Sequence, residues 1–154
     1  MISLLVVCLG NICRSPLAHG ILQHQLPEDK FYVDSAGTAA YHIGNTPDPR
    51  SIKVAKAHNI DISSQSARQF KVSDFDNFDY IYAMDKSNYN NIISLARTNE
   101  DHHKVKLFLD ENETATNKNV PDPYYGNIDD FLDVFNLLQE TSNVITKKLT
   151  VTHI

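Results

Sequence analysis

The chain has 154 residues, of which 42% are hydrophobic, so it is long enough to bury one core, and we expect a single domain over residues 1–154. A formal net charge of -5 gives it no basic field, which makes nucleic acid and anionic membrane surfaces poor candidate partners. The apolar run at residues 2–7 has no basic segment before it and is too short for a signal peptide or a membrane span.

Cys8 and Cys13 are the only cysteines in the chain. They lie too close together to form the disulfide framework of a small secreted domain, and without neighbouring histidines they make a poor zinc site. We therefore expect no metal and no cofactor. We also expect the protein in a reducing cytoplasm, with export without a leader left open.

The first predicted element is a buried strand over residues 3–7, because the run is apolar without alternation. Cys8 follows it, then Gly10 and Asn11, which tolerate left-handed backbone conformations, and then a Ser-Pro pair that favours a helix start at Pro16. A loop in this position turns its backbone N–H groups inward, at the positive end of the helix. The sequence thus predicts a phosphate-binding loop.

Cys8 and Arg14 are spaced as C-x5-R across this loop. The N–H dipoles, the helix N-terminus and the Arg14 cation all favour the thiolate of Cys8 over the thiol. The planar fork of Arg14 can hold two oxygens of a phosphoryl group. The pair therefore predicts a nucleophile beside a phosphate clamp.

The rest of the chain alternates between strands and helices. The predicted strands cover residues 3–7, 32–36, 80–84 and 105–109. The predicted helices cover residues 16–25, 50–58, 86–96 and the segment that follows Asn127, with a short helical turn at 72–75. This alternation predicts an α/β fold, a three-layer domain with a four-stranded parallel sheet and helices on both faces. Ligands of such folds bind beyond the carboxyl ends of the strands, where Cys8 is expected.

Four segments carry a resemblance to a known family. They are VCLGNICRSP at residues 7–16, DSAGT at 34–38, FDYI at 78–81 with the pair Met84-Asp85, and DPYYG at 122–126. The first looks nearly letter for letter like the active-site loop of the low-molecular-weight protein tyrosine phosphatases, in their bacterial type. The similarity extends over most of the chain, and it implies hydrolysis of phosphotyrosine through a cysteinyl-phosphate intermediate.

In that family the DPYYG segment carries the general acid, so the resemblance assigns this role to Asp122, which lies between two prolines. Cys8 is then the nucleophile, and Arg14 is the clamp for the phosphoryl oxygens. Ser15 is placed to donate a hydrogen bond to the Cys8 sulfur. By the same resemblance, Asn11 braces the loop.

Further residues are assigned to the loop, the pocket and its partners. Support of the phosphate-binding loop is expected from Leu9, Gly10, Asn11, Ile12, Cys13 and Ser15. The pocket walls are expected to be Leu9, Tyr41, Tyr124 and Tyr125. Cys13 is expected to be the redox partner of Cys8, because a sulfenic acid can condense with a nearby thiol. The expected partners are phosphotyrosine-containing proteins and a tyrosine kinase that acts on Tyr124 or Tyr125.

Three alternatives remain at this point. An arsenate reductase of this fold needs further cysteines downstream, and none follows Cys13. A protein arginine phosphatase is distinguished mainly by the tyrosine pair and by Ile12, where such enzymes carry a threonine. A non-catalytic phosphotyrosine-binding module would predict the loss of Cys8, Arg14 or Asp122, and all three are present.

Two further groups are expected to have ordinary structural roles. Asp85 follows the third predicted strand and is expected to cap the next helix rather than to act in catalysis. The histidines at 42, 102 and 103 are expected to be solvated at the surface.

Overall fold

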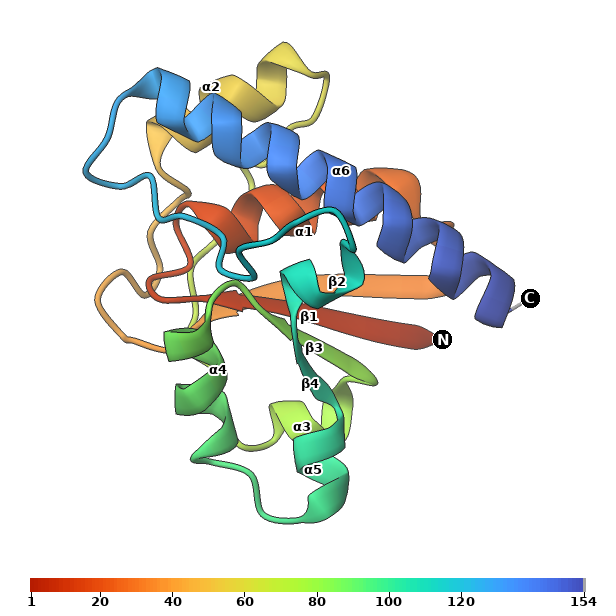
Figure 1. Cartoon of the computed structure of the whole chain (residues 1–154). Helices are drawn as coiled ribbons and strands as arrows, with labels where there is room; N and C mark the ends of the chain where they lie inside the picture. Colours follow the sequence, from red (N-terminus) through yellow and green to blue (C-terminus); the bar gives the residue numbers. More distant parts are fainter. Residues whose placement is uncertain (154) are drawn as a thin grey trace.

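The computed structural model describes residues 1–153, which form a four-stranded parallel sheet with helices on both faces (Figure 1). In chain order the elements are β1 (Ile2–Cys8), α1 (Arg14–Gln25), β2 (Phe31–Gly37), α2 (Pro49–Ala57), α3 (Asp74–Asn77), β3 (Tyr80–Ala83), α4 (Lys86–Ile93), α5 (Asn99–His103), β4 (Val105–Leu107), the 3-10 helix η1 (Phe108–Glu111) and α6 (Ile128–Thr152). The predicted α/β fold is confirmed.

Strand β1 lies inside the sheet, whose order is β2-β1-β3-β4, and each neighbouring pair is parallel. Its residues Leu4, Leu5, Val6 and Val7 are completely buried. Leu4 and Val6 belong to the apolar cluster on one face of the sheet, and Leu5 and Val7 belong to the cluster on the other. Because both faces are covered, the strand is apolar without alternation.

Helices α1, α2 and α6 cover one face of the sheet, and α3, α4 and α5 lie on the other (Figure 1). A capping box opens α6, in which the Asn127 side chain accepts from the Asp130 N–H and the Asp130 carboxylate accepts from the Asn127 N–H. The predicted core-facing residues of α6 are all buried, namely Phe131, Val134, Phe135, Leu138, Ile145 and Leu149. Within residues 1–153, no helix combines the length and the apolar character needed to cross a bilayer.

The structure departs from the sequence-based expectation between residues 94 and 111. Helix α4 ends at Ile93 rather than at 96, because the next turn tightens and the Leu95 N–H bonds the Ile92 carbonyl. Strand β4 ends at Leu107 rather than at 109, because the buried Phe108 and Leu109 turn into η1. The sequence analysis missed both η1 and α5, since four- and five-residue helices are too short to show a period.

Candidate active site

The phosphate-binding loop, residues 8–15, connects the carboxyl end of β1 to the first turn of α1. Cys8 ends the strand with 3% of its surface exposed. Within residues 1–153, no side chain caps the start of α1, and none of its first-turn residues is acidic. The N–H groups and the positive end of the helix are therefore left for an anionic ligand, as the sequence predicts.

Two backbone features shape this loop. Asn11 has a φ of 58°, the left-handed conformation expected from its residue type. Gly37, at the end of β2, packs directly against the loop, and a Cβ atom there would lie 2.7 Å from the Leu9 carbonyl oxygen. The N–H groups of Thr38 and Ala39 bond the carbonyls of Cys8 and Leu9, both at 2.9 Å. The loop backbone therefore rests on the end of β2.

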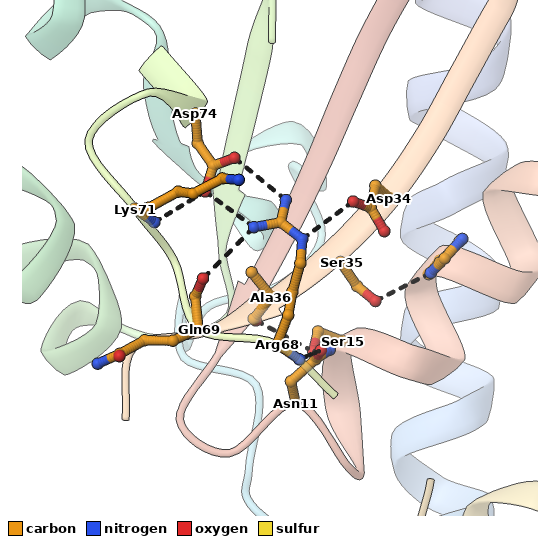
Figure 2. A network of polar contacts seen from close by, with 10 residues as sticks. Asn11, Ser15, Asp34, Ser35, Ala36, Arg68, Gln69, Lys71 and Asp74 are labelled. Atoms are coloured by element: carbon orange, nitrogen blue, oxygen red, sulfur yellow. Dashed lines mark hydrogen bonds and ion pairs between the residues drawn. The ribbon is translucent and has the colours of Figure 1, made fainter. Parts of the chain in front are cut away.

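A chain of hydrogen bonds runs from the Arg68 N–H through Asn11 to Ser15 (Figure 2), and Ser15 in turn contacts the Cys8 sulfur. The Arg68 N–H donates to Asn11 Oδ1 at 3.1 Å, so the amide must present Nδ2 to Ser15 Oγ, 2.8 Å away. That contact uses the hydroxyl oxygen as an acceptor and leaves its proton to be donated. Cys8 Sγ lies at 3.0 Å and the Ala36 carbonyl at 3.5 Å, so the sulfur is the nearer acceptor.

The Asn11 N–H adds a second contact to Cys8 Sγ, at 3.3 Å. Two hydrogen-bond donors thus converge on the Cys8 sulfur. The bracing contact expected for Asn11 and the contact expected between Ser15 and Cys8 are thus both present in the structure.

Arg14 is buried, with 3% of its side chain exposed. Its Nη1 donates to Asp85 Oδ2 at 2.7 Å and to the Val120 carbonyl at 3.0 Å. Within residues 1–153 these are the hydrogen bonds of its guanidinium, so Nε and Nη2 remain for a ligand. Burial alone would lower the pKa of Arg14, but the negative sulfur of Cys8 and the hydrogen bond to Asp85 raise it on balance. Arg14 is therefore a fixed positive charge.

Asp85 has a role that the sequence analysis missed. Its Oδ1 caps α4 by accepting the Asn88 N–H at 2.8 Å, as predicted, and its Oδ2 holds Arg14. Because the two residues are 71 positions apart, no local pattern connects them. Asp85 orients the guanidinium of Arg14 in addition to capping a helix.

Asp122 lies on the acid segment, which we define as residues 121–126. Its Oδ2 is 3.6 Å from Arg14 Nη2, and its Oδ1 accepts the Tyr124 N–H at 3.1 Å. The side chain is 42% exposed, so water and substrate can reach it. A carboxyl group thus faces the same pocket as the thiol and the guanidinium.

The pocket above Cys8 has a volume of about 130 Å³. Its walls are Cys8, Leu9, Gly10, Ile12, Cys13, Arg14, Tyr41, His42, Asp122, Tyr124 and Tyr125. The structure thus brings together all four expected wall residues and the three expected catalytic residues. His42 is half-buried between the rings of Tyr41 and Tyr124, so the expectation that it is an ordinary surface histidine was wrong. The position of His42 depends on the path of the irregular segment after β2, and no sequence pattern reveals that path.

Cys13 is the second buried free cysteine of the loop. Its sulfur lies 4.0 Å from Asp48 Oδ2. Burial and then the negative charge of Asp48 raise the pKa of the Cys13 thiol. Cys13 therefore stays a neutral thiol.

Comparison with known proteins matches this arrangement to one family. The sequence model of the low molecular weight phosphotyrosine protein phosphatases covers residues 3–152. The protein of that name from Schizosaccharomyces pombe is 42% identical over 153 residues, which cover 96% of this chain and 97% of the relative.

Solved structures agree with the sequence comparison. A protein tyrosine phosphatase from Entamoeba histolytica, solved with Hepes in its active site, superimposes with a TM-score of 0.93 at 35% identity over the whole of both chains. YfkJ from Bacillus subtilis gives a TM-score of 0.92 at 35% identity, over all of this chain and 98% of the other. The chain therefore belongs to the low molecular weight phosphotyrosine protein phosphatase family.

Proposed function

We propose that this protein is a protein tyrosine phosphatase, a hydrolase that removes phosphate from phosphotyrosine-containing proteins. One observation carries the proposal: a sulfur with two hydrogen-bond donors, Cys8, shares a pocket with the buried cation of Arg14 and the carboxyl group of Asp122. These are the nucleophile, the clamp and the acid that cleavage of a phosphate monoester needs.

In the first step, the Cys8 thiolate attacks phosphorus, so that an S–P bond forms as the P–O bond to the tyrosine breaks. The Asp122 carboxylic acid gives its proton to the departing phenolic oxygen. Arg14 and the loop N–H groups hold the non-bridging oxygens, and the loss of one such donor typically costs about 3–4 kcal/mol of transition-state stabilisation. The products are tyrosine and a cysteinyl-phosphate.

In the second step, water attacks the cysteinyl-phosphate and gives a proton to the Asp122 carboxylate. The new O–P bond replaces the S–P bond, inorganic phosphate leaves, and Cys8 returns to its thiolate form. The Ser15 hydroxyl, 3.0 Å from the sulfur, stabilises that leaving thiolate. Asp122 ends the cycle protonated, ready for the next substrate.

Aromatic walls favour a flat, long side chain as substrate. Tyr41, Tyr124 and Tyr125 rim the pocket, and the rings of the last two lie edge to face at 5.0 Å. A phosphotyrosine ring can lie between such walls while its phosphorus reaches the thiolate at the floor. Phosphoserine is too short to do so.

The experiment that tests this function compares the wild type with Cys8→Ser on phenyl phosphate and on phosphotyrosine peptides. We expect the variant to lose turnover while it keeps its fold, because the loop geometry depends on backbone and on Arg14. Its thermal midpoint, Tm, measured by circular dichroism, provides the control. Appreciable turnover by Cys8→Ser would contradict the proposal.

A redox role for the second cysteine is a further part of the proposal. A sulfenic acid on Cys8 condenses with the Cys13 thiol, water leaves, and a disulfide forms that protects Cys8 from further oxidation. Because burial raises the pKa of the Cys13 thiol, we expect this closure to accelerate with rising pH. Mass spectrometry after peroxide treatment decides the point, since a sulfinic Cys8 beside a free Cys13 would contradict it.

We also propose that the protein works in the cytoplasm. Two free, buried cysteines suit a reducing cytoplasm, where the Cys8 thiolate persists.

Tyr125 is 95% exposed and is the more accessible of the two tyrosines that a kinase could modify. Phosphorylation assays with Tyr124→Phe and Tyr125→Phe would show which residue, if either, accepts phosphate. We also propose that residues 1–154 form one phosphatase domain.

A further inference from the structure

Arg50 is a residue to which neither the motif nor the mechanism gives a part. It lies in the first turn of α2, and its side chain is 34% exposed. Its guanidinium lies between the phosphate-binding loop on one side and the acid segment on the other. It hydrogen-bonds the acid segment directly and reaches the loop through Asp48.

Asp48 fixes Arg50 on the loop side. Its carboxylate accepts from Arg50 Nε at 3.0 Å and from Nη2 at 2.9 Å, a two-pronged contact that sets the plane of the fork. The Asp48 N–H donates to the Ile12 carbonyl at 2.7 Å, so Asp48 is itself tied to the phosphate-binding loop. The orientation of Arg50 is therefore set by the loop that holds the nucleophile.

On the other side, Arg50 holds the acid segment. Its Nη1 donates to the Gly126 carbonyl and its Nη2 to the Tyr124 carbonyl, both at 2.9 Å. Its central carbon lies 4.3 Å from the ring centroid of Phe131, the α6 residue that supports the fork from below. The guanidinium thus donates hydrogen bonds to two carbonyls of the segment and packs on the buried ring of Phe131.

These two contacts have no counterpart elsewhere in the acid segment. Within residues 1–153, the hydrogen bonds that join 121–126 to the rest of the chain are the two donated by Arg50. The remaining hydrogen bonds are internal to the segment, from the Tyr124 N–H to Asp122 and from the Gly126 N–H to the Pro123 carbonyl. Arg14 adds one longer ion contact to Asp122, at 3.6 Å.

We propose that Arg50 is a positioning residue for proton transfer: it holds the acid segment in register with the phosphate-binding loop, so that Asp122 reaches the leaving oxygen. The proposal rests on the function proposed above. Arg50 does not line the pocket, so it acts through Asp122. An error of about 1 Å in the placement of a catalytic group can cost on the order of 100-fold in rate, so two hydrogen bonds have a measurable effect.

The test measures kcat/KM on two substrates that differ in their need for an acid. Phenyl phosphate has a poor leaving group, whereas dinitrophenyl phosphate releases a phenolate that needs no proton. For Arg50→Ala we expect kcat/KM to fall roughly 10- to 100-fold with phenyl phosphate and to stay within about 3-fold with dinitrophenyl phosphate. Arg50→Lys, which keeps the charge without the fork, should show a smaller loss with the same selectivity.

A double-mutant cycle separates positioning from a general structural role. In an Asp122→Asn background, Arg50→Ala should cause no further loss with phenyl phosphate, because the acid through which Arg50 acts is already absent. The matched control is Arg97→Ala, which removes an arginine of similar exposure that is bound to Asp76 and Asp101, away from the pocket. Activity of this control should not change on either substrate.

The outcomes distinguish this proposal from the function on which it rests. Equal losses on both substrates in the two Arg50 variants, or additive losses in the cycle, would overturn the role of Arg50 while Asp122→Asn still showed leaving-group dependence. If the wild type hydrolysed neither substrate, or Cys8→Ser remained active, the function itself would fail. Where Arg50→Ala melts below the assay temperature, Arg50→Lys provides the same comparison.

Discussion

The proposed mechanism needs both the phosphate-binding loop and the acid segment, yet the two are built in opposite ways. The loop is buried except at Leu9 and Gly10, rests on the end of β2, and is braced internally by Asn11. The acid segment is exposed over most of its length, and Arg50 donates the hydrogen bonds that join it to the rest of the described chain. One site therefore combines a part fixed by many contacts with a part fixed by few.

The contrast follows from what each part must do. An anion is stabilised by donors that are already in place, since donors that had to reorganise would lose that stabilisation. A proton donor must instead lie at the open side of the pocket, where the substrate enters and the leaving group departs. The following predictions test this division, from the largest expected effect to the smallest.

The acid segment should matter only where a proton is needed. For Asp122→Asn we expect kcat/KM with phenyl phosphate to fall by roughly 100- to 1,000-fold, and much less with dinitrophenyl phosphate. Steady-state kinetics on the two substrates measure the difference. If both rates fell equally, Asp122 would belong structurally with the loop, and the contrast between the two parts would be lost.

The substrate class should be set where the two parts meet. Ile12, on the loop, offers no hydrogen bond to a phosphoarginine guanidinium, whose donors would be buried without partners beside the tyrosine walls. We expect kcat/KM on phosphotyrosine peptides to exceed that on phosphoarginine peptides of matched sequence by about 100-fold. Comparable values would contradict this, and Ile12→Thr would then be expected to change little.

Within the loop, the hydrogen bond from Ser15 should affect the release of the Cys8 sulfur and not the proton transfer from Asp122. Ser15→Ala removes a donor to Cys8 Sγ, and a hydrogen bond to a charged group is worth about 1.5–3 kcal/mol, so kcat should fall roughly 10- to 100-fold. Rapid-quench measurement of the cysteinyl-phosphate should show the intermediate accumulating, because its breakdown releases the thiolate. Leaving-group dependence like that of Asp122→Asn would count against this assignment.

The smallest expected effect concerns His19, behind the loop on α1, whose Nδ1 lies 2.9 Å from Ser35 Oγ. Burial lowers the pKa of His19 from its ordinary value of 6.5, a shift to which Arg68 also contributes and which Asp34 opposes. The unfolded chain therefore binds a proton that the folded chain does not, and stability falls as the pH drops below about 6.5. Tm measured across this range should depend less on pH in His19→Gln, and an unchanged slope would contradict the prediction.

Prediction from sequence succeeded where the signal is local. The apolar run of β1, the Gly10-Asn11 turn and the Ser-Pro helix start lie within one stretch of chain, so the loop and its chemistry followed from composition and spacing. The acid was different, because a Pro-Asp-Pro turn has no chemistry of its own, and only its resemblance to a known segment pointed to Asp122. The structure then placed it beside Arg14.

What the sequence could not provide are contacts between distant segments. Asp85 reads as a helix cap because its Asn88 contact is local, whereas its contact with Arg14 spans 71 residues. The carbonyls held by Arg50 lie 74 and 76 residues away, and backbone carbonyls carry no residue type that a pattern could record. The sequence identified the reacting groups but not the residues that hold them in place.

The hydrogen-bond chain that braces the loop begins at a main-chain N–H group, which a substitution of the side chain leaves in place. The donor that orients Asn11 is the main-chain N–H of residue 68, which every amino acid except proline supplies. The Arg68 side chain serves a separate purpose, since it pairs with Asp34 and Asp74 (Figure 2). The hydrogen bond that orients Asn11 therefore does not depend on the side chain at position 68. One support of the loop is thus set by the path of the main chain and not by the type of residue at this position.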